Sequence, residues 1–148
     1  MPIPDPNPAG LLPPGVHDCS IDEVLERFGV FNETDRRVDL GRRLSAFHQE
    51  LLEANVAVAL IVDGSFVTAK AAPGDIDVAL VLRSDLDLRV LVPPFQYNPR
   101  SKGYVKKKYG FDFFFCFEGQ DEILEPLLTY FSQTKEGIGT KGVLRIPL

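Results

Sequence analysis

Two aspartates, Asp75 and Asp77, stand at the start of a hydrophobic run in the segment GDIDVALVL. We expect a strand over 75–82, and because side chains alternate between the two faces of a strand, both carboxylates would project to the same side. Buried, unpaired carboxylates are costly, and two that lie so close repel each other unless a cation stands between them. Oxygen-only ligands suit Mg²⁺ or Mn²⁺, so the pair predicts a divalent metal site.

A third carboxylate, Asp112, is the one charged residue of the aromatic run GFDFFFCF. A strand this aromatic is buried on at least one face, so an aspartate within it needs a partner. A metal shared with Asp75 and Asp77 would supply that partner. Two metals on three carboxylates can clamp the attacking and leaving oxygens of a phosphoryl displacement.

Gly64 and Ser65 follow the apolar, β-branched run over 56–62, which predicts a buried strand. Glycine at such a turn lets backbone N–H groups approach a phosphate, and the serine hydroxyl adds a donor. One edge of the sheet would therefore offer phosphate donors close to the metal ligands of two strands.

The order hydrophobic residue, Gly-Ser, gap, Asp-hydrophobic-Asp-hydrophobic in DGSFVTAKAAPGDIDV resembles the signature of the DNA polymerase β-like nucleotidyltransferase superfamily. The segment is most similar to its minimal members, small (MNT-like) proteins often found in toxin–antitoxin pairs. More narrowly, LPPGVHDCSIDEVLERFG, IVDGSFVTAK and GTKGVLRIPL resemble an uncharacterised bacterial group of nucleotidyltransferase-like proteins.

The resemblance implies a nucleotidyltransferase fold and transfer of an NMP group from an NTP to a hydroxyl on a protein or an RNA, with Mg²⁺ or Mn²⁺ as cofactor. In that superfamily the third acid activates the attacking hydroxyl. The residues implied to bind the nucleotide are Gly64, Ser65 and Lys70, and those implied to be catalytic and to bind metal are Asp75, Asp77 and Asp112.

Two alternatives stay open. The fold could be kept with catalysis weak or lost, in which case the chain would act as a toxin–antitoxin component or a nucleotide-binding partner. In a purely structural α/β protein, PGDID would be a turn with an exposed strand start, since Asp and Gly favour turns.

Other patterns compete for a role. GIGTKG, over 137–142, matches G-x-G-x-x-G, but no βαβ unit follows it; a flexible or substrate-gating loop with Lys135 or Lys141 near phosphate fits better. KKKY, over 106–109, is by default a solvated loop, with triphosphate or RNA contact as the alternative. Asp85 and Asp87 form a rival D-x-D pair.

Periodicity and punctuation predict the elements that must position these residues. The arginines at 36, 37, 42 and 43 are expected on a solvated helix face, and GVLRIPL is expected as an edge strand because proline suits an edge. We expect helices over 20–29, about 34–55 and 121–132; strands over 56–62, 75–82 and about 109–117; a third strand or extended segment over 86–92; and a loop over 95–103.

The 148 residues suffice for one domain, which we expect over 11–148 after a flexible proline-rich arm over 1–10. The element order predicts an α/β (α+β) fold with a small mixed sheet packed against helices. A net charge of −5 argues against broad nucleic-acid coating, and no apolar run approaches the ~20 residues of a membrane span. Two cysteines far apart indicate reduced thiols of a cytoplasmic protein.

Overall fold

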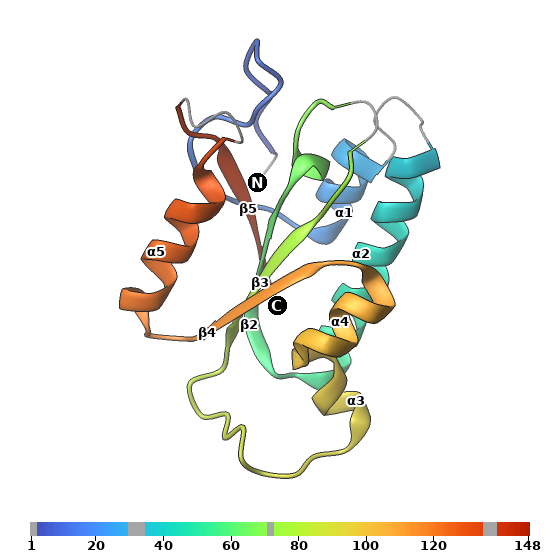
Figure 1. Cartoon of the computed structure of the whole chain (residues 1–148), viewed down its shortest axis with the longest axis vertical. Helices are drawn as coiled ribbons and strands as arrows, with labels where there is room; N and C mark the ends of the chain where they lie inside the picture. The colour runs from blue at the N-terminus through green and yellow to red at the C-terminus, as the bar shows by residue number, and fades with distance from the viewer. Residues whose placement is uncertain (1–2, 30–34, 71–72, 135–138) are drawn as a thin grey trace.

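A single mixed β-sheet organises the molecule in the computed structural model, which describes residues 3–29, 35–70, 73–134 and 139–148. The strand order is β1-β5-β2-β3-β4 (Figure 1). The outer pairs, β1 with β5 and β3 with β4, are parallel, and the inner pairs are antiparallel. The strands are β1 (Gly15–Asp18), β2 (Ala57–Asp63), β3 (Asp77–Leu82), β4 (Asp112–Phe117) and β5 (Gly142–Pro147).

Helices cover both faces of the sheet. Figure 1 shows α5 alone on one side and the remaining helices on the other. The helices are α1 (Ile21–Val24), which continues into a π turn over Leu25–Gly29, α2 (Asp35–Ala54), α3 (Pro94–Tyr97), α4 (Lys102–Tyr109) and α5 (Asp121–Ser132), with 3-10 turns over Ser65–Val67 and Asn98–Arg100. The expected α+β class is confirmed.

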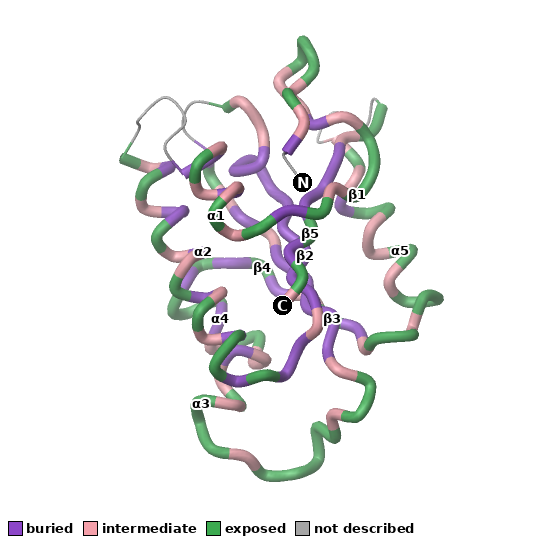
Figure 2. Tube along the Cα trace, turned by 180° about the vertical axis from the view of Figure 1, so that it is seen from behind, coloured by how far each residue is buried: buried purple, intermediate pink, exposed green. Residues whose placement is uncertain are grey.

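The sheet separates two hydrophobic cores, and its central strands are buried along their length (Figure 2). Alternation along each strand divides the side chains between the cores. The larger core joins Leu60, Val62, Val78 and Leu80 to α2, and the smaller joins Ala59, Ile61, Ala79, Val81 and Cys116 to Phe131 of α5. Asp63, Asp77 and Asp112 share the α5 face, because each lies an even number of residues from members of the smaller core.

Several expected elements are confirmed. The helix expected over 121–132 is α5, and the strand expected over 56–62 is β2. Ser20 and Glu23 form the capping box that starts α1. The long helix is α2, which the structure describes from Asp35; Thr34 lies outside the described residues.

The loop expected over 95–103 was wrong, as was the strand start near residue 109. Ser101 caps the N-terminus of α4, its hydroxyl accepting from the Tyr104 amide, and Gly110 ends the helix in the left-handed conformation with φ 79°. The three lysines that suggested a solvated loop, over 106–108, form the last turn of α4. Lysines there complement the negative end of the helix dipole.

The strands differ from expectation at three places. β3 begins at Asp77 rather than Asp75. β5 is an interior strand, because the unpredicted β1 pairs with its outer side. Pro147 is tolerated because it is the last residue of β5. Residues 86–92 form turns and no strand.

The N-terminal segment from residue 3 to residue 10 lies against the domain. Ile3 is buried, and the Ala69 amide donates to the carbonyl of Gly10 at 2.8 Å. Whether this arm is flexible stays a prediction. In the described part of the chain, no helix combines the length and apolar character that a membrane crossing requires.

Candidate active site

Three aspartates form a row across neighbouring strands at one end of the sheet. Asp63, the last residue of β2, pairs in register with Asp77, the first residue of β3. Asp77 pairs in turn with Asp112, the first residue of β4. Residues paired across strands project to the same face, with neighbouring Cβ atoms about 5 Å apart. The register therefore brings three carboxylates together on the α5 side of the sheet.

A cavity of about 630 Å³ opens beside this acidic row. All six residues expected at the site line it. They are Gly64, Ser65, Lys70, Asp75, Asp77 and Asp112, and Asp63, Thr68 and Lys141 join them. The structure thus brings the expected residues to one place, although their roles as ligands or catalysts remain predictions.

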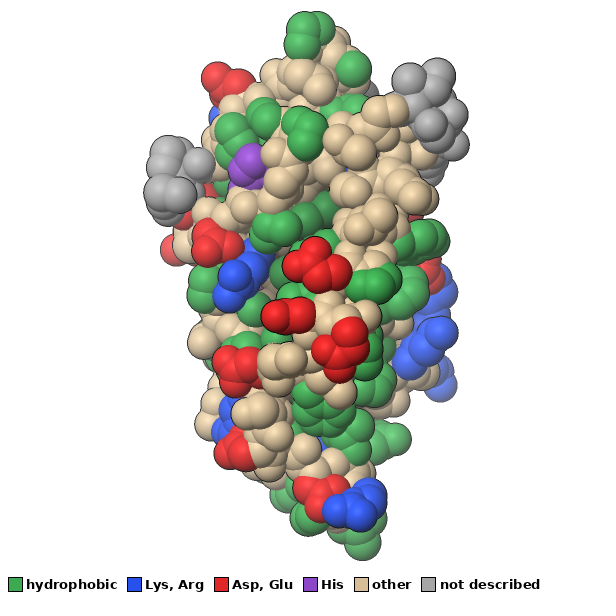
Figure 3. Space-filling view, turned by 90° about the vertical axis from the view of Figure 1, so that its left-hand side faces the viewer, with side chains coloured by type: hydrophobic (Ala, Val, Ile, Leu, Met, Phe, Trp, Pro, Cys, Tyr) green, Lys and Arg blue, Asp and Glu red, His purple; other side chains and the backbone are tan. Residues whose placement is uncertain are grey.

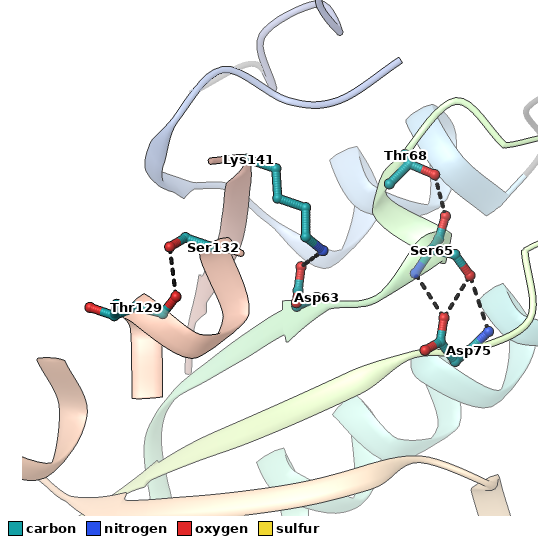
Figure 4. A network of polar contacts seen from close by, with 7 residues as sticks. All are labelled: Asp63, Ser65, Thr68, Asp75, Thr129, Ser132 and Lys141. Carbon is teal, nitrogen blue, oxygen red and sulfur yellow. Dashed lines mark hydrogen bonds and ion pairs between the residues drawn. The ribbon is translucent and has the colours of Figure 1, made fainter. Parts of the chain in front are cut away.

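Asp75 precedes β3 and is fixed by the Gly-Ser turn (Figure 4). One of its carboxylate oxygens, Oδ1, accepts from the Ser65 amide at 2.9 Å and from the Ser65 hydroxyl at 2.6 Å. The Ser65 hydroxyl also accepts from the Gly74 amide at 2.9 Å. Ser65 therefore positions the Asp75 side chain. The sequence analysis had instead placed Asp75 within the strand, where alternation alone would set its direction.

Gly64 is required by a close approach of two backbone segments. Its φ is 98°, and a Cβ there would lie 2.9 Å from the Asp75 carbonyl oxygen and 3.1 Å from the Asp77 nitrogen. Neither backbone atom can move without displacing the acids themselves. Glycine therefore lets the turn after β2 pack directly against the segment that carries Asp75 and Asp77.

Asp63 was missed by the sequence analysis. It forms an ion pair with Lys141, with Nζ to Oδ1 at 2.7 Å, and the two side chains are only 5% and 12% exposed (Figure 4). Burial raises the pKa of Asp63, and the attraction of Lys141 opposes that rise. In the sequence, the only indication of a role for Asp63 is its position directly before Gly64. The strand register shows that Asp63 belongs to the acidic row.

The carboxyl of Asp77 has a strongly raised pKa. Burial raises its pKa to about 7, and the charges of Asp75, Asp63 and Asp112 add to the effect, together with a hydrogen bond to Asp112. Crowded carboxylates favour a shared proton or a bound cation.

Asp112 is exposed and not buried among the phenylalanines, because it is the first residue of an edge strand. Its partner is Lys106 of α4, with Nζ to Oδ1 at 2.8 Å. The sequence analysis did not foresee Lys106 as this partner, and a metal ligand role for Asp112 stays a prediction. The same contact raises the pKa of the Lys106 ammonium.

The expected solvated arginine face was wrong for Arg37, which is fully buried. Its guanidinium donates to four backbone carbonyls, those of Phe28 at 3.1 Å, Phe66 at 2.8 Å, Thr68 at 2.6 Å and Lys70. Arg37 therefore ties α2 to the segment over 66–70, part of which lines the cavity. No sequence pattern distinguished it from Arg42, which is exposed on the same helix.

The competing patterns lie elsewhere. Asp85 and Asp87 pair with Arg83 and Arg89 on the surface and do not line the cavity. Of the GIGTKG segment, Gly137 and Ile138 lie outside the described residues, as does Lys135.

The donor set fits a hard divalent cation. Four carboxylates, those of Asp63, Asp75, Asp77 and Asp112, line one cavity, and Mg²⁺ and Mn²⁺ prefer such oxygen ligands. Within the described ranges, no group of three or more His, Cys, Asp or Glu side chains is already arranged to hold a metal ion. Metal binding would therefore require side-chain adjustment, such as exchange of the Lys106 contact at Asp112.

Comparison with known proteins gives a family but no activity. Residues 4–147 match the family described as Family of unknown function (DUF6932), and the chain belongs to that family. No curated protein matches the chain, and no solved structure matches it either.

Proposed function

We propose that this DUF6932 member is a metal-dependent nucleotidyltransferase that moves an NMP group from an NTP to a hydroxyl of a protein or an RNA. One observation carries the proposal: the acidic row of Asp63, Asp77 and Asp112 shares a cavity with Asp75 and the Gly-Ser turn. A cavity that combines crowded carboxylates with lysine side chains suits a metal-bound triphosphate.

Asp75 and Asp77 would hold Mg²⁺ or Mn²⁺, with Asp112 as a further ligand. When bound, the metal would offset the negative charge of the phosphates and orient the triphosphate. Lys70 and Lys141 line the same cavity and would add positive charge toward the β- and γ-phosphates.

Asp112 would act as the general base. It would take the proton of the acceptor hydroxyl while that oxygen forms a bond to the α-phosphorus. The bond from the α-phosphorus to the bridging oxygen breaks, and pyrophosphate leaves. The ion pair with Lys106 would hold the Asp112 carboxylate at the cavity until the substrate displaces Lys106.

The exposed acidic surface of the α5 side of the molecule favours a protein acceptor over RNA. Acidic side chains gather over the middle of the face on which α5 lies (Figure 3), and Asp121, Glu122 and Glu125 of α5 are exposed. A phosphate backbone would be repelled there. A cytoplasmic location belongs to the proposal as well, since the free, buried thiols of Cys19 and Cys116 suit a reducing compartment.

Transfer of label from NTPs to acceptors in a cell extract, with Mg²⁺, tests the activity. We expect wild type to label a protein band and Asp77→Asn to label none. Asp87→Asn is the matched control, because Asp87 belongs to the other D-x-D pair and lies outside the cavity lining. An unlabelled extract with wild type, or equal labelling by Asp77→Asn, would contradict the proposal.

A second candidate is a binding module without turnover, acting on its own or as one half of a toxin–antitoxin pair. It is favoured by the contacts that already engage the acids, Ser65 with Asp75 and Lys106 with Asp112. Calorimetric titration with Mg²⁺ and NTP, together with the transfer assay, distinguishes the binding module from the enzyme. The binding module requires NTP binding that Asp75→Ala abolishes and no transfer of NMP by wild type. Relief of toxicity on co-expression with a neighbouring gene product would identify the paired form.

A further inference from the structure

One wall of the cavity is aromatic and neutral, unlike the acidic row. It contains Phe114 of β4, and Tyr130 and Gln133 at the C-terminal end of α5. We call these three residues the aromatic wall. Phe114 lies two residues beyond Asp112 on the same face of β4, a spacing of about 7 Å along the strand. The aromatic wall therefore begins one side-chain position away from the acidic row.

The Phe114 ring of this wall rests against the smaller core. Phe114 packs edge-on against Phe131, with ring centroids 5.5 Å apart and planes at 76°. Phe131 belongs to the smaller core and is 1% exposed. A ring anchored on a buried neighbour loses little entropy when a ligand packs on it.

Tyr130 is 61% exposed although it lies beside two aromatic rings. Its centroid is 6.1 Å from that of Phe114 with the planes tilted by 59°, and 6.1 Å from that of Phe131 with a tilt of 46°. Tilted rings do not cover each other as stacked rings do, so ring surface remains available to a flat ligand.

Gln133, three residues after Tyr130, lines the same cavity and adds hydrogen-bonding capacity. A side-chain amide offers both donors and an acceptor, which match the paired donor and acceptor atoms on the edge of a base such as adenine. Aromatic surface for stacking together with polar groups for the base edge is the usual chemistry by which proteins hold an unpaired base.

We propose that the aromatic wall is a base-binding subsite, where the Tyr130 ring stacks on the planar heterocycle of a nucleotide, the tilted Phe114 ring contacts it edge-on and Gln133 bonds its edge. The inference rests on the proposed function for the triphosphate half of the ligand, which would lie over the acidic row. The ribose of the nucleotide would then connect the triphosphate over the acidic row to the base at the aromatic wall. The ligand class is a nucleoside triphosphate whose base contributes to affinity.

Calorimetric titration of the full chain with Mg²⁺·ATP and with Mg²⁺·tripolyphosphate, which has no base, tests the subsite. We expect wild type to bind ATP about tenfold more tightly than tripolyphosphate, the usual size of a single stacking contribution. Tyr130→Ala should lose this advantage and bind tripolyphosphate as wild type does. Tyr130→Phe should retain it, because the ring makes the contact.

Tyr97→Ala is the matched control, since Tyr97 is 51% exposed on α3 and does not line the cavity. It should bind both ligands as wild type does. Equal affinity of wild type for ATP and tripolyphosphate would overturn the subsite, as would unchanged ATP binding by Tyr130→Ala.

The two proposals fail separately. A wild-type protein that transfers NMP while Tyr130→Ala binds ATP unchanged would remove the subsite alone. A wild-type protein that prefers ATP to tripolyphosphate in a Tyr130-dependent way, but transfers no NMP, would contradict the proposed enzyme activity and support the subsite. Binding of neither ligand would remove both.

Discussion

Asp77 is half-buried and has carboxylates on three sides. Two of them, Asp63 and Asp112, are its register partners, and the third, Asp75, lies two residues earlier in the chain. Lys141 and Lys106 pair with the outer members of the row. Such crowding of carboxylates lowers the stability of the fold, as is common at functional sites.

Asp77→Asn should stabilise the fold in a pH-dependent way. The pKa of Asp77 is about 7 in the folded protein, above the ordinary 3.8, so folding favours the protonated form. The raised pKa therefore lowers the stability of the wild-type fold, with no cost below pH 3.8, a cost that grows as the pH rises toward 7, and the full cost above pH 7. Thermal unfolding from about pH 4 to pH 8 should show the stability of the variant relative to wild type rising until about pH 7 and staying constant above it. A constant difference would contradict the raised pKa.

Arg37→Met should destabilise the protein by about 3–5 kcal/mol, because it leaves buried carbonyl oxygens without donors. The carbonyls concerned include those of Phe28, Phe66 and Thr68. Urea denaturation measures the loss. Arg42→Met, on the exposed face of the same helix, should change stability by less than about 0.5 kcal/mol. Equal losses for the two variants would mean that burial of the guanidinium is not what matters.

At the scale of elements, the turn after β2 couples fold and site. Gly64→Ala should cost about 1–3 kcal/mol from its φ of 98° alone, and more from the contact with the 75–77 backbone. Gly103→Ala is the control, because a Cβ there meets nothing within 4 Å and α4 gains helix propensity. Urea denaturation should show a loss for the first variant and no loss for the second. A neutral Gly64→Ala would imply that the turn can relax.

Periodicity found the elements with long regular patterns, such as α2, α5 and β2. Periodicity failed where capping residues or strand pairing, rather than a hydrophobic pattern, determine the element. α4 depends on the Ser101 cap and the left-handed Gly110, and its eight residues show little amphipathic pattern. β1 has four residues and exists only because β5 pairs with it. Pairing of that kind is a tertiary effect that no local pattern carries.

For the candidate site, local motifs were enough to find Asp75, Asp77 and the Gly-Ser turn, since these are close in sequence. Asp112 followed from its contrast with the surrounding phenylalanines. Asp63 and Arg37 could not be found in this way, because the role of each depends on strand register or on burial. The acidic row is a property of three strands together.

At the scale of the whole molecule, distant segments meet at the cavity. The sheet end supplies the acids, and Leu11, just after the N-terminal arm, lines the same space as Lys141. The arm is linked to this region by the bond from the Ala69 amide to the Gly10 carbonyl. Ile3 belongs to the larger core and is 8% exposed. Arm and domain therefore share a core in the folded chain.

Deletion of residues 2–10 tests whether the N-terminal arm stabilises the fold or only covers the surface. Loss of the buried Ile3 side chain should cost about 1.5–3 kcal/mol in urea denaturation. Ile3→Ser in the full chain should give most of this loss. Asp5→Asn should give almost none, because its ion pair with Arg27 is exposed at Asp5. If the arm is flexible, as its prolines predict, the deletion will leave stability within about 0.5 kcal/mol of wild type.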